Sequence, residues 1–83
     1  MATLIRVDGS REEVEIPKNG SLKAMQTAVG GNIEVGGIAP DGRTILCDEE
    51  GLLCNKEPNP TAFSWGLPLV GDILLVTDGK EFK

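Results

Sequence analysis

The sequence GDILLVT, at residues 71–77, contains the most apolar predicted strand of this chain of 83 residues. Its four residues from Ile73 to Val76 are all aliphatic, and no polar residue alternates with them. An unbroken apolar run of this length is typical of a strand that is buried on both faces. We therefore predict a central strand over residues 73–77.

The other predicted strands are short and are separated by turn signals rich in Gly, Asp and Pro. They lie at residues 3–7, 13–16, 32–35, 44–47 and 52–54. Turn signals at residues 8–10 and 40–42 predict that the first four of these strands form two hairpins. Gly36-Gly37 interrupts the second hairpin, which predicts a bulge or a close approach of another segment.

Two short helices are predicted between the strands. The first begins near Ser21, a possible cap, and ends at Gly30, since glycine favours the left-handed conformation after a helix. Its apolar face is predicted to contain Leu22, Met25 and Val29. The second begins at Asn59-Pro60, which pairs a capping side chain with proline at the first helical position, and ends at Gly66. The order β-β-α-β-β-β-α-β predicts an α+β fold with a small, mostly antiparallel sheet.

Length and charge narrow the possible functions. The chain suffices for one modest core, so residues 1–83 are predicted to be a single domain, with a frayed polar tail at 78–83. Thirteen acidic and eight scattered basic residues leave a net charge of −5, which argues against binding to nucleic acid or to an anionic membrane. The absence of a signal peptide or a membrane-spanning run predicts a cytoplasmic protein.

The residues available for chemistry argue against an enzyme. Without histidine, the common Ser-His and Cys-His nucleophile arrangements are impossible, and a zinc site is not expected. Residues 48–50 are acidic, but an acidic run at a turn is usually a solvated loop. If they form a hairpin loop, Cys47 and Cys54 are a diagonal pair about 7–8 Å apart, so free thiols are expected. The prediction is a protein that is not an enzyme and has no metal or cofactor.

Five residues are candidates for ligand binding. Arg6 and Arg43 could bind the phosphates of a ligand. Asn59 and Thr61 lie at a predicted helix start with free N–H groups, although Asn59 is also explained as a structural cap. Trp65, the single tryptophan, could stack on a planar ligand or anchor an interface, or it could fill the core.

Several short motifs occur in a distinctive order between Leu22 and Val76. They are Val29-Gly30-Gly31-Asn32-Ile33-Glu34, Asp48-Glu49-Glu50-Gly51, Asn59 with Ala62, and Gly71-Asp72. In this respect the chain resembles a family of small proteins of unknown function that phages, plasmids and bacteria encode. That family is often aromatic at the position of Asn32 and often has Asn at the position of Asp48. The resemblance implies a mobile element, such as a phage, and it implies no mechanism.

Two functional hypotheses follow. The first is a binding protein that sequesters a small nucleotide signal of bacterial antiviral defence, as a homo-oligomer whose chains build the pocket together. The second is an acidic inhibitor that binds a host defence or regulatory protein. An enzyme is the least favoured alternative.

Overall fold

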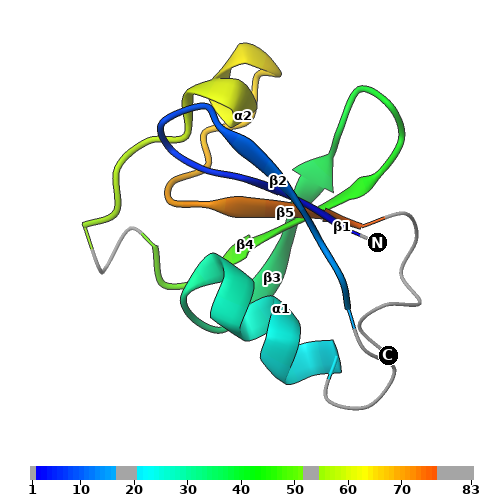
Figure 1. Cartoon of the computed structure of the whole chain (residues 1–83). Coiled ribbons are helices and arrows are strands. Elements are labelled where there is room, and N and C mark those ends of the chain that lie inside the picture. The colour runs from blue at the N-terminus through cyan, green and yellow to red at the C-terminus, as the bar shows by residue number, and fades with distance from the viewer. Residues whose placement is uncertain (1, 17–20, 52–54, 77–83) are drawn as a thin grey trace.

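The computed structural model describes residues 2–16, 21–51 and 55–76, which form one five-stranded antiparallel sheet and two helices (Figure 1). The elements are β1 (Ala2–Ile5), β2 (Arg11–Val14), α1 (Ser21–Val29), β3 (Ile33–Ile38), β4 (Thr44–Asp48), α2 (Pro60–Ser64) and β5 (Ile73–Val76). The predicted α+β class and antiparallel sheet are confirmed. The strand predicted at 52–54, the state of Cys54 and the tail at 78–83 lie outside the described residues.

Strand β5 lies at the centre of the sheet, whose strand order is β2-β1-β5-β4-β3. It pairs with β1 on one side and with β4 on the other, and all four of its residues are buried. Leu74 and Val76 point to one face of the sheet, and Ile73 and Leu75 point to the other. The central strand that the apolar run predicts is therefore confirmed.

Two hydrophobic cores cover opposite faces of the sheet, and α1 and α2 lie on these two faces (Figure 1). The α1-side core consists of Ala2, Leu4, Met25, Val29, Leu46, Leu74 and Val76. The α2-side core consists of Ile5, Ala39, Ile45, Cys47, Ala62, Ile73 and Leu75, with Trp65, Leu67 and Leu69 packed against it. The molecule therefore has three layers, and both cores share the sheet.

The helix α1 ends as the sequence predicts. Gly30 has a φ of 82°, and the N–H groups of Gly30 and Gly31 both donate to the carbonyl of Gln26. Its predicted apolar face is only partly right, because Leu22 is 51% exposed. Leu22 has the angular position of Val29, but periodicity does not show whether the first turn of a helix extends over a sheet.

The predicted bulge is present in β3, where the register with β4 shifts between Val35 and Gly37. A Cβ on Gly36 would lie 2.9 Å from Leu69, so the segment after α2 packs closely on this strand. Within the described ranges, no helix is long and apolar enough to cross a membrane.

Candidate functional site

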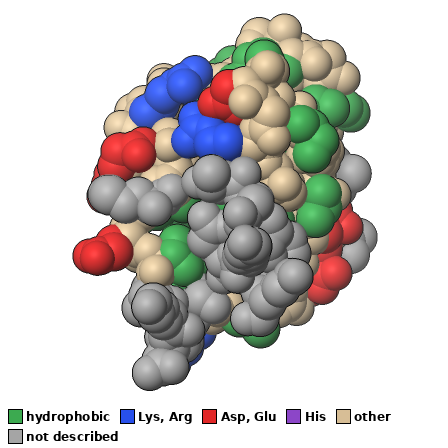
Figure 2. Space-filling model, turned by 90° about the vertical axis from the view of Figure 1, so that its right-hand side faces the viewer, with side chains coloured by type: hydrophobic (Ala, Val, Ile, Leu, Met, Phe, Trp, Pro, Cys, Tyr) green, Lys and Arg blue, Asp and Glu red, His purple; other side chains and the backbone are tan. Residues whose placement is uncertain are grey.

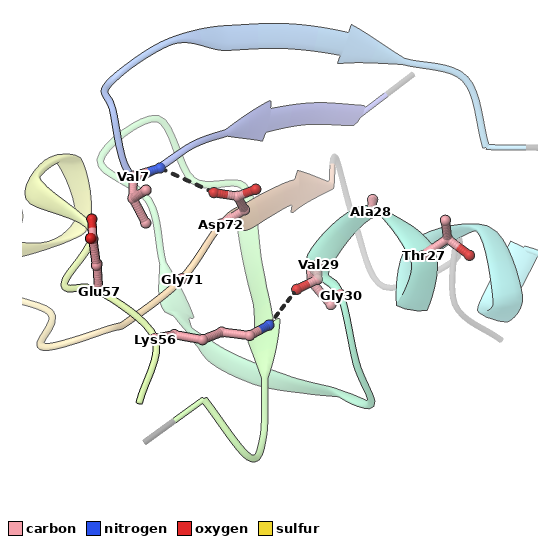
Figure 3. Close-up of a pocket in the computed structure, with 9 residues that line it drawn as sticks. All are labelled: Val7, Thr27, Ala28, Val29, Gly30, Lys56, Glu57, Gly71 and Asp72. Carbon is pink, nitrogen blue, oxygen red and sulfur yellow. Dashed lines mark hydrogen bonds between the residues drawn. The ribbon is translucent and has the colours of Figure 1, made fainter. Parts of the chain in front are cut away.

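A pocket of about 350 Å³ lies where the C-terminal end of α1 meets the segments before and after α2 (Figure 3). It is lined by Val7, Thr27, Ala28, Val29, Gly30, Lys56, Glu57, Gly71 and Asp72. These residues come from four separate parts of the chain. The fold, rather than any one segment, therefore builds this pocket.

Lys56 connects these parts. Its ammonium group lies 2.9 Å from the carbonyl oxygen of Val29 and 2.7 Å from Oδ2 of Asp48. A cation is favourable at this place because the unpaired carbonyls give a helix a negative C-terminal end. A Cβ on Gly71 would lie 2.7 Å from Cδ of Lys56, so the absence of a side chain at Gly71 leaves room for the lysine.

Asp48 is the buried partner of this ion pair, with only 4% of its side chain exposed. Its Oδ1 accepts a hydrogen bond of 2.9 Å from the N–H of Glu50. The hydrogen bond from Lys56, followed by that from Glu50, lowers the pKa of Asp48 below its ordinary value. A Cβ on Gly31 would lie 2.6 Å from this carboxylate, so the second glycine of the Gly30-Gly31 pair makes space for it.

A second hollow, of about 390 Å³, also has Gly30 in its lining. Asp48 and Glu50 line it together with Gly31, and Gln26 donates a hydrogen bond of 3.2 Å to Asn32. Gly30 lines both hollows, and each of them is bordered by one member of the Asp48–Lys56 ion pair.

Asn59, a predicted ligand contact, is fully buried, and its side chain serves the fold. Its amide donates to the carbonyls of Ile5 at 3.1 Å and Gly71 at 3.0 Å, while its Oδ1 accepts from the N–H of Ala62 at 3.2 Å. It is therefore the cap of α2, as predicted, and it also ties α2 to β1 and to the turn before β5.

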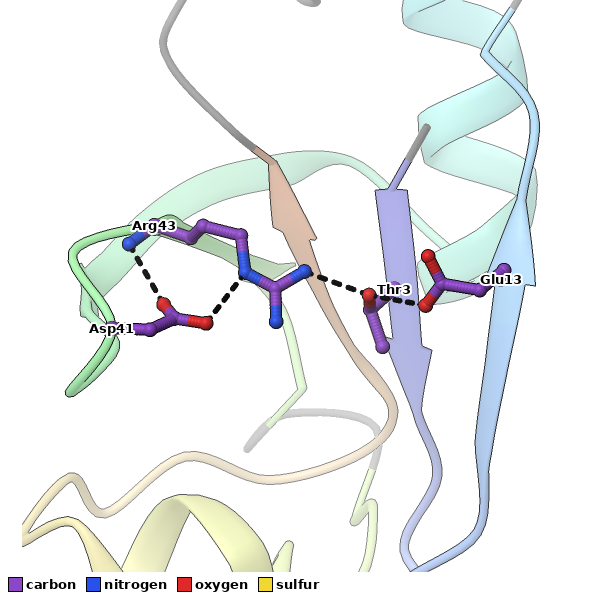
Figure 4. A network of polar contacts seen from close by, with 4 residues as sticks. All are labelled: Thr3, Glu13, Asp41 and Arg43. Atoms are coloured by element: carbon purple, nitrogen blue, oxygen red, sulfur yellow. Dashed lines mark hydrogen bonds and ion pairs between the residues drawn. The ribbon is translucent and has the colours of Figure 1, made fainter.

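The two predicted arginines form ion pairs within the chain. Arg6 pairs with Glu12 of the neighbouring strand. Arg43 binds Asp41 through Nε at 2.8 Å, and its Nη1 donates to the hydroxyl of Thr3 at 2.7 Å (Figure 4). Neither guanidinium lines either of the two hollows.

The remaining predicted residues lie on and after α2. Thr61 is half-buried, and its carbonyl accepts a hydrogen bond from the hydroxyl of Ser64. Trp65 is half-buried and packs against the α2-side core. Of the five predicted ligand residues, none lines the pocket at the end of α1. Sequence reasoning missed Lys56 and Gly71 as site residues, although the Gly30-Gly31 and Gly71-Asp72 pairs were available as signals of close packing.

A comparison with protein families shows to which family this chain belongs. A family model described as "Domain of unknown function (DUF3846)" matches residues 1–83. The chain belongs to this family. No curated protein and no solved structure matches it. The description of DUF3846 gives no activity, so a functional proposal depends on the geometry of the site.

Proposed function

We propose that this protein is a non-enzymatic binding protein and that its pocket at the end of α1 holds a positively charged group of a ligand. The observation that carries this proposal is the charge of the lining. Asp72 and Glu57 contribute two carboxylates, while the cation of the lining, Lys56, is already bound by Asp48 and by a helix carbonyl.

The backbone adds to the negative character of this pocket. Thr27 and Ala28 belong to the last turn of α1, where carbonyl groups have no partner within the helix. Asp72 uses Oδ1 to accept a hydrogen bond of 3.1 Å from the N–H of Val7, which fixes the carboxylate in place. An amine or a guanidinium would complement these groups, whereas a phosphate would be repelled by them.

The volume of the pocket supports a small ligand or a single side chain. About 350 Å³ lies near the lower end of the range of about 300–1,000 Å³ that is typical of small-molecule sites. The aliphatic stem of Lys56 and the side chain of Val7 offer apolar surface beside the carboxylates (Figure 3). A compact alkyl amine would therefore contact both kinds of surface.

The chemistry of the described residues supports binding without catalysis. The sequence has no histidine, so no imidazole base can activate a nucleophile. The thiol of Cys47 is buried, and burial, followed by the charges of Glu34 and Asp48, raises its pKa to about 11. A thiol with so high a pKa is poorly suited to act as a nucleophile at neutral pH.

Sequestration of a nucleotide signal stays a prediction. Arg6 and Arg43, the residues expected to bind its phosphates, are both engaged by carboxylates of this chain. We retain from the resemblance the proposal that a phage or another mobile element supplies the protein to the host cytoplasm. We also propose that the protein forms a homo-oligomer.

The experiment is a titration of the ¹⁵N-labelled protein with agmatine, putrescine, AMP and a cyclic dinucleotide, followed by amide chemical shifts. We expect the two amines to shift residues 27–30 and 71–72, and Glu57→Gln to weaken this binding several-fold. Glu49→Gln is the matched control, because Glu49 is exposed and lines neither hollow. If the nucleotides shifted the same residues and the amines shifted none, the pocket would instead bind a negatively charged ligand.

A further inference from the structure

The two edges of the sheet differ in their side chains. The outer strand β2 has the sequence Arg-Glu-Glu-Val, and its first three residues are exposed and charged. Charged side chains on an edge strand discourage pairing with another chain. The opposite edge, β3, instead exposes Val35 by 57% and Ile38 by 60%. In Figure 2, hydrophobic side chains gather along one border of the molecule, and most of the visible basic side chains lie toward the opposite border.

The backbone of β3 has hydrogen-bonding groups that point away from the sheet. The carbonyl of Asn32 accepts from Glu49, and the N–H of Ala39 donates to the carbonyl of Arg43, so these residues face β4. Since the direction alternates along an antiparallel strand, the groups of Ile33, Val35 and Ile38 face outward. Among the residues that the structure describes, no strand pairs with this outer side of β3.

The side chains of β3 alternate in character between the two faces. Val35 lies opposite Leu46 and Ile38 lies opposite Thr44, which places both apolar side chains on the face of the sheet that α1 covers. Glu34 lies opposite Cys47, on the other face, and is exposed. A complementary strand would therefore carry apolar residues on the α1 face and a basic residue beside Glu34.

We propose that β3 binds an extended segment of another protein, in which apolar and basic residues alternate, as a sixth strand of the sheet. Backbone hydrogen bonds to Ile33 and Val35 would supply the affinity, and the side chains of Val35 and Glu34 would supply the selectivity. The net charge of −5 favours a basic segment over long distances as well. This proposal concerns a partner protein and does not depend on the ligand of the pocket.

A second copy of this chain fits the same edge less well. A two-fold axis at Glu34 would place this residue directly opposite its own copy, which is unfavourable for like charges. A two-fold axis at Val35 would bring Ile33 opposite Gly37, whose backbone groups face Ile45 of β4 because of the bulge. Either arrangement loses hydrogen bonds or pairs like charges, which a separate basic segment avoids.

The test uses hydrogen exchange of the labelled protein with two blocked peptides of six residues, one alternating Val with Lys and one alternating Val with Glu. We expect only the Val-Lys peptide to slow exchange at Ile33 and Val35, at least tenfold at saturation, with the effect falling as salt is added. Glu34→Lys should reverse the preference between the peptides. Glu12→Lys, on the charged edge β2, is the matched control and should leave it unchanged.

Four results would overturn this inference. Equal protection by both peptides would show that charge does not select the partner. Protection by neither peptide at millimolar concentration would show that the edge does not bind an added strand. Protection that rises with protein concentration in the absence of peptide would assign the edge to a second copy. Slow exchange at Ile33 and Val35 in dilute protein without any peptide would show that another segment of the same chain already occupies the edge.

Discussion

Two polar side chains, Asn59 and Lys56, hold the segments around α2 in place. Asn59 caps α2 and satisfies two backbone carbonyls, and Lys56 joins the end of α1 to Asp48. Both act through hydrogen bonds to groups that are distant in sequence. Their loss should therefore loosen the frame of the pocket even when the hydrophobic cores are unchanged.

Replacing Asn59 tests the first of these roles. Asn59→Ser retains a capping oxygen but leaves the carbonyls of Ile5 and Gly71 without their donors. An unsatisfied buried polar group costs about 1–3 kcal/mol, so we expect the free energy of unfolding to fall by about 2–4 kcal/mol in urea denaturation. Thr61→Ala, on the same helix, should change it by less than about 0.5 kcal/mol. A fall of similar size in both variants would contradict the role of Asn59.

The lowered pKa of Asp48 makes the stability of the fold depend on pH. Because Lys56 and the N–H of Glu50 lower its pKa in the folded state, its contribution is complete above the unfolded pKa of about 3.9. That contribution should be lost as the pH falls from there through the lower folded pKa. Asp48→Asn should lower stability at pH 7, by less than the roughly 3–5 kcal/mol of a fully buried pair, because Lys56 is 25% exposed.

The measurement is the urea midpoint of both proteins between pH 2 and pH 7. The difference between them should shrink below about pH 4. Asp8 and Asp41 also have lowered pKa values, but they are exposed and remain in both proteins. A difference that stays constant over the whole range would show that the charge of Asp48 does not stabilise the fold.

Among the elements, the connection from α1 to β3 combines a left-handed backbone conformation with close packing. Gly30 ends the helix with a positive φ, and Gly31 lies against the carboxylate of Asp48. Neither residue lies ahead of a helix N-terminus, where a phosphate-binding loop would place its glycines. The Gly-Gly motif thus serves the junction between a helix and an ion pair.

Substitutions of Gly31 and Gly42 distinguish the cost of close packing from the cost of backbone strain. In Gly31→Ala the new Cβ would lie 2.6 Å from Asp48, which both Lys56 and Glu50 hold in place. In Gly42→Ala nothing lies within 4 Å, and only the positive φ of 92° opposes the side chain, at about 1 kcal/mol. We expect the larger loss of thermal stability in Gly31→Ala, and the reverse order would disprove the packing role.

For the whole molecule, the important feature is that both hydrophobic cores are built on one sheet. Leu74 lies in the α1-side core and Leu75 in the α2-side core, yet they are neighbours in β5. Damage to either core therefore disturbs the strand on which the other depends. We expect the domain to unfold in one cooperative transition.

Two probes can test this cooperativity. Trp65 fluorescence reports on the α2-side core, and far-UV circular dichroism reports mainly on the longer helix α1. In Leu74→Ala, which should cost about 2–5 kcal/mol, both midpoints should shift together, although Trp65 packs on the other face. Midpoints that separate would show that the two layers unfold independently.

Elements whose signals are local could be predicted from the amino-acid sequence. The apolar run of β5, the cap at Asn59-Pro60 and the glycine after α1 are confirmed, because each depends on neighbouring residues or on the conformational freedom of glycine. These signals, together with those of two hairpins, were sufficient to predict the α+β class.

Which distant side chains contact one another became known from the three-dimensional structure. Asp48, Lys56 and Gly71 come together because the strand order places their segments side by side, and no periodicity encodes that neighbourhood. The same holds for the carboxylate partners of Arg6 and Arg43, Glu12 and Asp41, which the sequence alone did not identify. Local propensity acts over a few residues, whereas a pocket depends on contacts between distant segments, which follow from the packing of the whole chain.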